Sequence, residues 1–540
     1  MSAVQLSCPP LPALRTGHRR AAIRCQAVTT ADKHSTASAV LGWATCKDLR
    51  YEQQPVQVQQ HPQYGRCLVA VQDIAADEVL LSVPTDRVFA SQAADDLQMH
   101  WAAEMGLRLL QERHAHRHSS SSSSSSSGGF WGTWVDSLPA SVVTPVEFTA
   151  AEVQQLVMPS AVQAVLNMRA CLEDCYCEME QQLQQIDCGW QDFLWAVQVL
   201  HSRCFFEPTS QRHLAVPGID MCNHSSTAPN ASVRMLHSPG ACQGLAALEE
   251  VAPAVAAAAC GSYFQLLAGP EGIAAGQQVC ISYGSWPAEP FLLLFGFVPQ
   301  PNPFDCITLF SSMQHMADCY LACCAAALQA ADGSSSDGAQ QCGGATTAAQ
   351  QLLQSPAFSA EFKQQVERIE QKLLQQQEAA GGAAGGPGGF HDLIVNASGV
   401  DGRLSAALSG MHEAVAAAAA AVPQSAGGIS SRSAGVLQDG AAVGAVAAAV
   451  QQLQLPLGVV LLHRLQQVTG EIEQKSSSSS SSSASSVLPQ ACTAAGGDDV
   501  EDSSCYEASA AHTELIQQYC SSKAALARQL IVQYGVSASA

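Results

Sequence analysis

Hydrophobic and polar residues follow two different periodicities along the chain, and each predicts a different element. Between residues 64 and 84, apolar residues concentrate in two short runs, Leu68 to Val71 and Val79 to Val83, on either side of a polar turn around Asp77. Short β-rich runs that flank a polar turn are typical of a hairpin. From 91 to 200 the pattern instead predicts helices, because apolar residues recur at helical spacing: Leu97, Trp101, Met105 and Leu109.

A different pattern marks a candidate binding site. The stretch Pro217 to Ser225 runs from apolar residues into Asp220 and then into the adjacent pair Asn223-His224. An apolar strand end that opens into hydrogen-bonding side chains is typical of a ligand site on a rigid scaffold. Two further apolar stretches follow downstream, Val279 to Gly284 and Phe291 to Val298. Taken singly, each stretch also fits an ordinary role in capping or in the core.

From about residue 310 the chain becomes rich in Ala and Gln, and it predicts a series of helices separated by linkers. The linkers, which we expect to be disordered, are the Gly-rich and Ser-rich segments 381–389 and 475–500. The helix-forming runs are Met313 to Ala331, Ala360 to Gln377, Leu404 to Val422, Gly444 to Leu455 and His512 to Tyr534.

Length and charge narrow the class of protein. A chain of 540 residues with 47% hydrophobic residues is long enough for several domains with a sizeable core. Its net charge of −21 argues against a nucleic-acid backbone as the main partner. Apolar runs stay well short of the ~20 residues that cross a bilayer. We therefore expect a monomer that binds neither nucleic acid nor membrane.

The 21 cysteines are scattered rather than arranged as metal ligands. Pairs such as Cys175 with Cys177, or Cys323 with Cys324, do not form a repeated C-x-x-C frame with histidine partners. We therefore predict no metal site, and buried free thiols in a reducing compartment.

The composition of two segments, 1–31 and 119–129, predicts that they lie outside the folded core. Residues 1–31 lack Asp and Glu but carry several arginines, which is the composition of an organelle transit peptide. An ordinary disordered N-terminus remains the other interpretation. The Ser and Gly tract 119–129 predicts a disordered insertion, because it has nothing to bury.

Taken together and in order, the candidate segments resemble the SET-domain methyltransferases, and specifically the plant Rubisco large-subunit methyltransferase-like group. The matching patterns of that group are D-x-x-N-H-S, S-Y-G, Y-G-F and N-P. They fall on Asp220 to Ser225, Ser282 to Gly284, Phe295 to Phe297, and Asn302-Pro303. Looser matches include the first hairpin at 64–84, a helix ending in Ser202-Arg203, and a short segment from Tyr519 to Leu526.

The resemblance implies an α+β fold with three parts. The first is a SET-domain β-fold with a pseudoknot-like core over 38–310. The second is a helical lobe inserted into it at about 91–200. The third is an all-α substrate-binding domain over 311–540.

The resemblance also implies the chemistry. The cofactor is S-adenosyl-L-methionine, the partner is a lysine-bearing protein segment, and Tyr283 is the catalytic residue whose hydroxyl faces the transferred methyl group. Ser202 and Asp220 are implied to line the lysine channel together with Tyr283. From the residues alone, pairing of Arg203 with a structural acid and a turn role for Asp220 stay open. The residues implied to bind the cofactor are Tyr64, Gly65, Arg66, Arg203, Asn223, His224 and Phe295.

Two departures from the family pattern bear on activity. Cys67 replaces a usual glycine in the opening turn, where close backbone approach or a positive φ is often wanted. Phe295 replaces the usual tyrosine of Y-G-F. We hypothesise that its ring packs against the cofactor and that the missing hydroxyl leaves room for a methylated amine, which favours multiple methylation. The other interpretation is that the loss of this hydroxyl reduces activity.

The leading prediction is an S-adenosylmethionine-dependent protein-lysine N-methyltransferase of the chloroplast stroma or the cytoplasm. By resemblance, its expected substrates are the Rubisco large subunit and chloroplast aldolase. Two other functions stay open: a protein-histidine methyltransferase, and an inactive SET scaffold that binds a protein partner.

Overall fold

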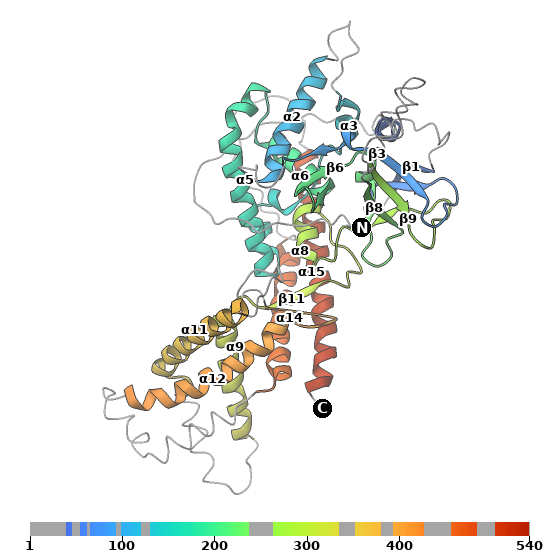
Figure 1. Ribbon diagram of the computed structural model, residues 1–540. Coiled ribbons are helices and arrows are strands. Elements are labelled where there is room, and N and C mark those ends of the chain that lie inside the picture. Colours follow the sequence, from blue (N-terminus) through green and yellow to red (C-terminus); the bar gives the residue numbers. More distant parts are fainter. Residues whose placement is uncertain are drawn as a thin grey trace. The chain divides into compact units, whose positions relative to one another are not determined.

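The structure is a computed structural model, and it falls into two compact units (Figure 1). The first unit comprises Met1–Gln154, Ala161–Pro303 and Gly497–Tyr519, and the second comprises the remaining segments, 155–160, 304–496 and 520–540. The residues that the structure describes are 39–45, 55–61, 65–92, 99–119, 130–236, 263–333, 352–379, 393–425, 455–482 and 503–538.

In its described residues, the first unit contains four small groups of paired strands. Those on its strand-rich side are β1 (Val56–His61) with β2 (Gly65–Ala70), and β3 (Val79–Pro84) with β9 (Tyr263–Ala268) and β8 (Ala231–Leu236), all antiparallel. A third group orders β4 (Phe89–Ala90), β6 (Arg212–Ala215) and β5 (Cys204–Glu207). In the fourth, β7 (Asn223–His224) and β10 (Cys280–Ile281) run parallel.

The predicted hairpin between 64 and 84 is wrong, although both of its strands exist. Strand β2 pairs with β1, and β3 pairs with β9, so the two strands do not pair with each other. The missed strand, β1, has the sequence VQVQQH, in which Val56 and Val58 are buried and the residues between are exposed. This alternation is a period-2 signal, and it gives β2 a nearer partner than β3.

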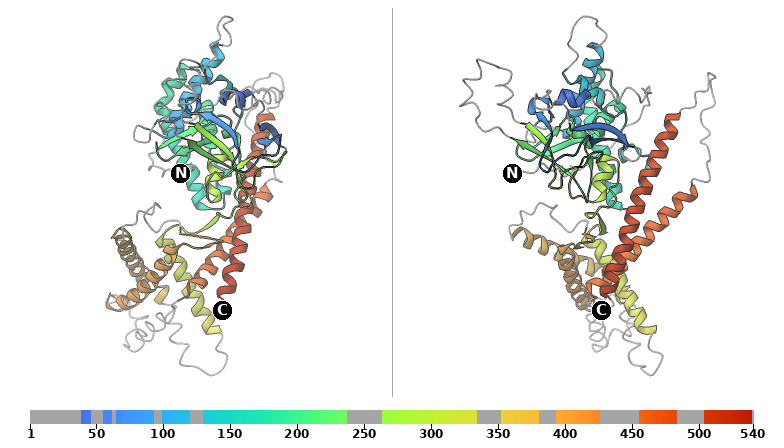
Figure 2. Two further views of the ribbon diagram at one scale, coloured as in Figure 1. Left: turned by 45° about the vertical axis from the view of Figure 1, so that its right-hand side comes forward. Right: turned by 90° about the vertical axis from the view of Figure 1, so that its right-hand side faces the viewer.

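Helices cover the other side of the first unit (Figures 1 and 2). The helices predicted over 91–200 are confirmed in the described residues, while Leu97 lies outside them. Their bounds are α2 (Trp101–Ser119), α3 (Gly132–Ser137), α4 (Ala150–Gln155), α5 (Pro159–Gln185) and α6 (Trp190–Arg203). Short helical turns are η1 (Thr85–Arg87), η3 (Pro145–Glu147), η4 (Ile219–Met221), α8 (Ala288–Pro290) and the π-helical η6 (Phe291–Phe295).

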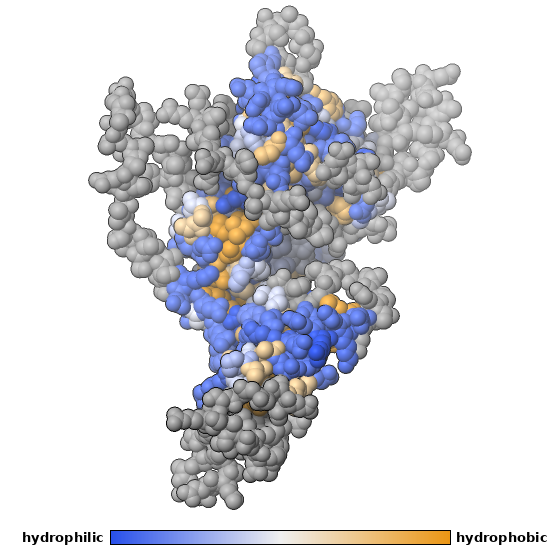
Figure 3. All heavy atoms as spheres, turned by 90° about the vertical axis from the view of Figure 1, so that its left-hand side faces the viewer, coloured by the Kyte–Doolittle hydropathy of each residue, from blue (hydrophilic) through white to orange (hydrophobic). Residues whose placement is uncertain are grey.

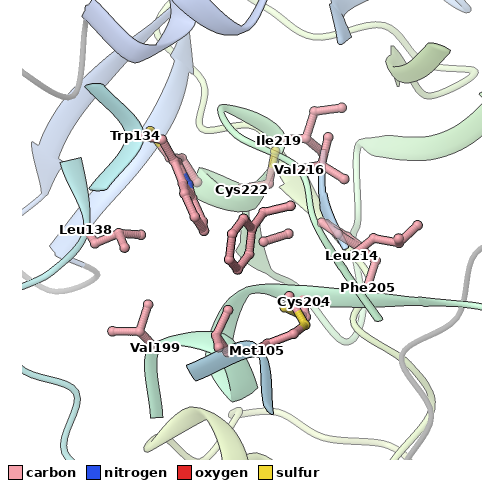
Figure 4. Packing of buried hydrophobic residues seen from close by; sticks show 14 of the residues in the cluster. Met105, Trp134, Leu138, Val199, Cys204, Phe205, Leu214, Val216, Ile219 and Cys222 are labelled. Carbon is pink, nitrogen blue, oxygen red and sulfur yellow. The ribbon is translucent and has the colours of Figure 1, made fainter. Parts of the chain in front are cut away.

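A single hydrophobic core joins these helices to the strands. Trp134, Phe193 and Phe264 are fully or almost fully buried in it. Figure 4 shows Trp134 from α3 and Cys204 and Phe205 from β5 packed in the same part of the core as Cys222, which follows η4. Burying such rings stabilises the unit by about 1.5–3 kcal/mol per side chain, so the turn at η4 is held on a rigid base.

The second unit combines helices with a small sheet. Its helices are α9 (Met313–Gly333), α11 (Pro356–Ala379), α12 (Gly402–Ser425), α14 (Leu457–Ser482) and the C-terminal part of α15 (Ser503–Ala538). The sheet has the order β11 (Cys306–Phe310), β12 (Leu393–Asn396) and β13 (Gly399–Val400). The prediction of an all-α domain over 311–540 is therefore wrong. The Leu-Ile-Val run of β12 and the Asn396-to-Gly399 turn carried the strand signal.

The Ser tract after 475 also departs from its prediction as a linker, because α14 continues through Ser482. A serine in a helix costs only about half a kcal/mol relative to alanine. Propagating an existing helix is far easier than nucleating one. Low sequence complexity thus does not by itself end a helix that begins in the apolar run after Leu457.

Several predicted segments lie outside the described residues: 1–31, most of 119–129, 381–389 and most of 444–455. Where residues are described on the face drawn in Figure 3, hydrophilic side chains predominate around a smaller hydrophobic area. Within the described part of the chain, each helix is too short or too polar to cross a membrane.

Candidate functional site

Strands β7 and β10 bring the two sequence motifs together. Asn223 lies opposite Cys280, and His224 opposite Ile281, in parallel register. The Asn230 side chain reinforces this pairing, because it accepts the Cys280 N–H at 2.8 Å and donates to the Gln278 carbonyl at 2.9 Å. Tyr283, two residues beyond β10, consequently lies beside the Asn223-His224 pair.

Tyr283 is fixed at both its backbone and its hydroxyl. The hydroxyl donates to the Cys222 carbonyl oxygen at 2.7 Å. Its ring lies 5.0 Å from that of Phe295 and 5.1 Å from that of His224, measured between centroids. Burial raises the pKa of Tyr283 above its ordinary value. The phenol therefore stays protonated at neutral pH and is a hydrogen-bond donor, not a base.

His224 is engaged by the protein on both ring nitrogens. Nδ1 accepts the backbone N–H of Tyr283 at 3.0 Å, and Nε2 lies 2.8 Å from Ser226 Oγ. Burial lowers the pKa of His224 to about 4, so the ring is neutral near pH 7. An accepting Nδ1 places the ring proton on Nε2, which donates to Ser226. The side chain thus holds Tyr283 in place, and cofactor binding through this residue stays a prediction.

Asp220 is the centre of a buried hydrogen-bond network. Its Oδ1 accepts the Gly218 N–H at 2.9 Å, and its Oδ2 accepts from Trp134 Nε1 at 3.2 Å. Arg203 NH1 lies 3.2 Å from the same Oδ2 and donates to the Asp220 carbonyl at 3.0 Å. The Asp220 side chain is 0% exposed. Both ordinary roles left open by the sequence therefore occur: Arg203 pairs with an acid, and Asp220 holds a turn.

A second cation, Arg66, shares this region and leaves it with excess positive charge. Arg66 donates to the Ser137 carbonyl. Burial, together with the nearby charge of Arg203, lowers the pKa of Arg66 to about 10, against an opposing effect of Asp220. In the described residues, the Nε of Arg203 is buried without a hydrogen-bond partner. Two guanidinium groups around one carboxylate suit a further anionic group.

A small pocket opens where these segments meet. Five of its lining residues were predicted from the sequence: Ser202, Arg203, Asp220, Tyr283 and Phe295. The sequence analysis did not single out the other three, Cys204, Phe205 and Cys222. Cys204 and Phe205 directly follow the Ser202-Arg203 motif, and Cys222 contributes a backbone carbonyl, for which side-chain patterns carry no signal.

The other described residues that were predicted to bind the cofactor do not line the pocket. Asn223 Nδ2 donates to the Arg66 carbonyl at 3.4 Å, which ties β7 to β2, and Gly65 has a φ of +65°. Cys67 is not among the residues with positive φ and lies in β2 opposite Gln59. The left-handed position is thus filled by glycine, and the substitution at Cys67 strains no turn. Tyr64 lies outside the described residues.

Gly296 is required where the π-helical turn η6 ends. Its φ is +69°, and a Cβ there would collide with the Val143 carbonyl oxygen. Only glycine satisfies both conditions without strain. Gly296 thus lets the chain turn after η6 while the Phe295 ring stays packed against Tyr283.

Comparisons with known proteins give a structural likeness only. No family model matches the chain, and no curated protein does. Among solved structures, it is similar to Rubisco LSMT bound to sinefungin and monomethyllysine, at 13% identity over 93% of this chain and 92% of that chain, with a TM-score of 0.48. It is also similar to the SET domain of LSMT bound to lysine and AdoHcy, at 15% identity over 93% and 92%, with a TM-score of 0.46.

Proposed function

We propose that the chain is an S-adenosylmethionine-dependent protein-lysine N-methyltransferase built on a SET-domain fold. The observation that carries the proposal is the convergence of four separated segments on one pocket. Ser202 and Arg203, Asp220, Tyr283 and Phe295 all line it, and these residues belong to the sequence motifs that resemble that family.

The charges of the site fit the proposed cofactor. Its amino-acid end carries a carboxylate, and in the described part of the chain Arg66 and Arg203 share one buried carboxylate, that of Asp220. The free Nε of Arg203, among the described residues, supplies a donor for such a group. When bound, the cofactor supplies a methyl group on a positively charged sulfur.

The protein's own residues supply position rather than acid–base chemistry. The Tyr283 hydroxyl donates its hydrogen bond to the Cys222 carbonyl, so its oxygen lone pairs are available to a methyl group as a weak C–H···O acceptor. His224 holds the backbone of Tyr283. Excess positive charge and apolar walls disfavour an ammonium group in the pocket, so a lysine is favoured in its neutral, nucleophilic form. Alignment at near-attack distance then provides most of the acceleration.

Titration calorimetry of the full chain with S-adenosylmethionine tests the cofactor assignment. We expect binding with a Kd of about micromolar, or about −8 kcal/mol. Asn223→Ala removes the link between β7 and the Arg66 carbonyl and should abolish measurable binding. The matched control is Asn167→Ala, a half-buried asparagine on α5 whose side chain accepts from Gln163, and this variant should bind like the native chain. Absence of binding by folded native protein would favour the inactive scaffold.

Phe295 sets the expected product. Its ring lines the pocket 5.0 Å from Tyr283 and offers no hydroxyl to anchor a water molecule. We expect di- or trimethylated product from the native chain and a shift toward monomethyl product in Phe295→Tyr, measured by mass spectrometry after long reaction times. The control is Phe297→Tyr, because Phe297 is not among the residues that line the pocket. Monomethyl product alone from the native chain would refute this role.

Location and substrate belong to the same proposal. The arginine-bearing, acid-free composition of 1–31 supports import into the chloroplast stroma. A stromal substrate such as the Rubisco large subunit or aldolase then follows from the sequence resemblance.

A further inference from the structure

Three histidines and a tryptophan cluster beside the end of α6 that reaches the pocket; Trp101, His201 and His213 are buried, and His100 is partly exposed. Trp101 begins α2 and stacks on His213 of β6, with ring centroids 3.8 Å apart and planes 2° from parallel. His201 of α6 lies 5.4 Å from Trp101 and 5.2 Å from His100, which directly precedes α2. His201 is followed by Ser202 and Arg203, both of which line the pocket.

The cluster has poor means of accommodating a positive charge. His201 is 6% exposed and His213 is 7% exposed. Within the described residues, His201 Nε2 and His100 Nδ1 are buried without hydrogen-bond partners. The titratable groups facing His201 are His100 and His213, while Cys175 of α5 accepts a backbone hydrogen bond from His100. These neighbours include no carboxylate that could balance an added proton.

Burial accordingly keeps two of these rings neutral. It lowers the pKa of His100 to about 4, and burial together with His100 and His213 lowers the pKa of His201 well below its ordinary value. In the unfolded chain, both rings take up a proton near pH 6.5. The unfolded state therefore binds more protons below that pH. The stability is fully present above about pH 6.5 and is lost as the pH falls toward the folded-state values.

We propose that this histidine cluster is an acid-sensitive switch: uptake of a proton by His201 or His100 unpacks the C-terminal end of α6 and disassembles the pocket around Ser202 and Arg203. Within the described residues, the charged or titratable groups facing His201 are histidines, so no carboxylate there balances a protonated ring among Trp101 and the core. The end of α6 has to move for the ring to reach water. The switch acts on the pocket itself, whichever reaction the pocket performs.

The test measures unfolding of the full chain by denaturant between pH 7.5 and pH 5. Each neutral buried histidine raises the unfolding equilibrium constant about tenfold per pH unit below pH 6.5, so two raise it about a hundredfold. Replacing either residue, as His201→Gln or as His100→Gln, should reduce that change from about a hundredfold to about tenfold per pH unit. Either variant suffices if the other does not fold. His114→Gln, near the exposed end of α2, is the control and should keep the native slope.

Hydrogen exchange gives the local readout. After correction for intrinsic rates, amides of residues 199–204 should lose protection between pH 7.5 and pH 5.5 in the native chain, and lose less in His201→Gln. Amides of α12 in the second unit should change little over the same range. Equal slopes for the native chain and both histidine variants, or unchanged protection at 199–204, would overturn the proposal.

Discussion

Replacing Tyr283 with phenylalanine should lower the rate of methyl transfer about 100- to 1,000-fold, comparable to the loss of one preorganised polar group in other active sites. The substitution keeps the ring that packs against Phe295 and His224 but removes the hydroxyl that bonds the Cys222 carbonyl. Cofactor affinity should stay within about threefold, because the lost contact acts mainly on the transferred group. The measurement is initial rate on a lysine-bearing substrate, beside calorimetric binding of S-adenosylmethionine.

A matched control separates this effect from the general loss of a tyrosine hydroxyl. Tyr176→Phe makes the same change on α5, where the ring packs against Trp190 and Phe193 away from the pocket lining. Its rate should equal that of the native chain. A native rate in Tyr283→Phe, at unchanged folding, would remove Tyr283 from the catalytic role. Because the raised pKa keeps Tyr283 protonated, its contribution should not titrate between pH 6 and pH 9.

Replacing Lys523 with alanine should lower the free energy of unfolding by about 3–5 kcal/mol. Lys523 on α15 is 0% exposed, and its Nζ lies 2.6 Å from Asp305 Oδ1 and 2.8 Å from the Cys306 carbonyl. Removing the amine leaves the buried Asp305 carboxylate without its counter-charge at the start of β11. Denaturant unfolding of the full chain, followed by a signal from the second unit, measures the loss.

A double substitution identifies the cause. Lys523→Met combined with Asp305→Asn removes both charges, so most of the lost stability should return. The exposed pair of Arg528 and Glu473, with both side chains 58% exposed and 3.4 Å apart, is the natural contrast. Arg528→Ala should cost less than about 1 kcal/mol. A loss of that small size in Lys523→Ala would mean that the buried pair does not stabilise the second unit.

The sequence predicted best what depends on local pattern. Helical spacing located the helices of the first unit, and α5 shows why: Val165, Met168 and Leu172 are buried at steps of three and four. The motifs that contain Ser202, Asp220 and Tyr283 lie together at one pocket in the structure. Each motif combines the apolar end of a helix or strand with polar residues. That pattern can be recognised in the sequence without knowing which distant residues the motif contacts.

What depends on distant partners was predicted poorly. The strands of the expected hairpin exist, yet β2 and β3 pair elsewhere, because pairing is decided by which apolar faces meet. The partnership of Arg203 with Asp220 was left open for the same reason, since it joins the end of α6 to η4 in space. The carbonyl of Cys222 could not be found, because any residue type supplies one.

The parallel pairing of β7 with β10 has a consequence for how the pocket comes into being. The Tyr283 hydroxyl and the Cys222 carbonyl are 61 residues apart in the chain, and Asn223 meets the Arg66 carbonyl across 157 residues. Closing such long loops costs entropy that only completed packing offsets. We therefore expect the contacts that close the pocket to form after the strand groups of the first unit have docked. A nascent chain that has not yet extended past β10 holds the Asn-His pair but has no tyrosine with which to complete the pocket.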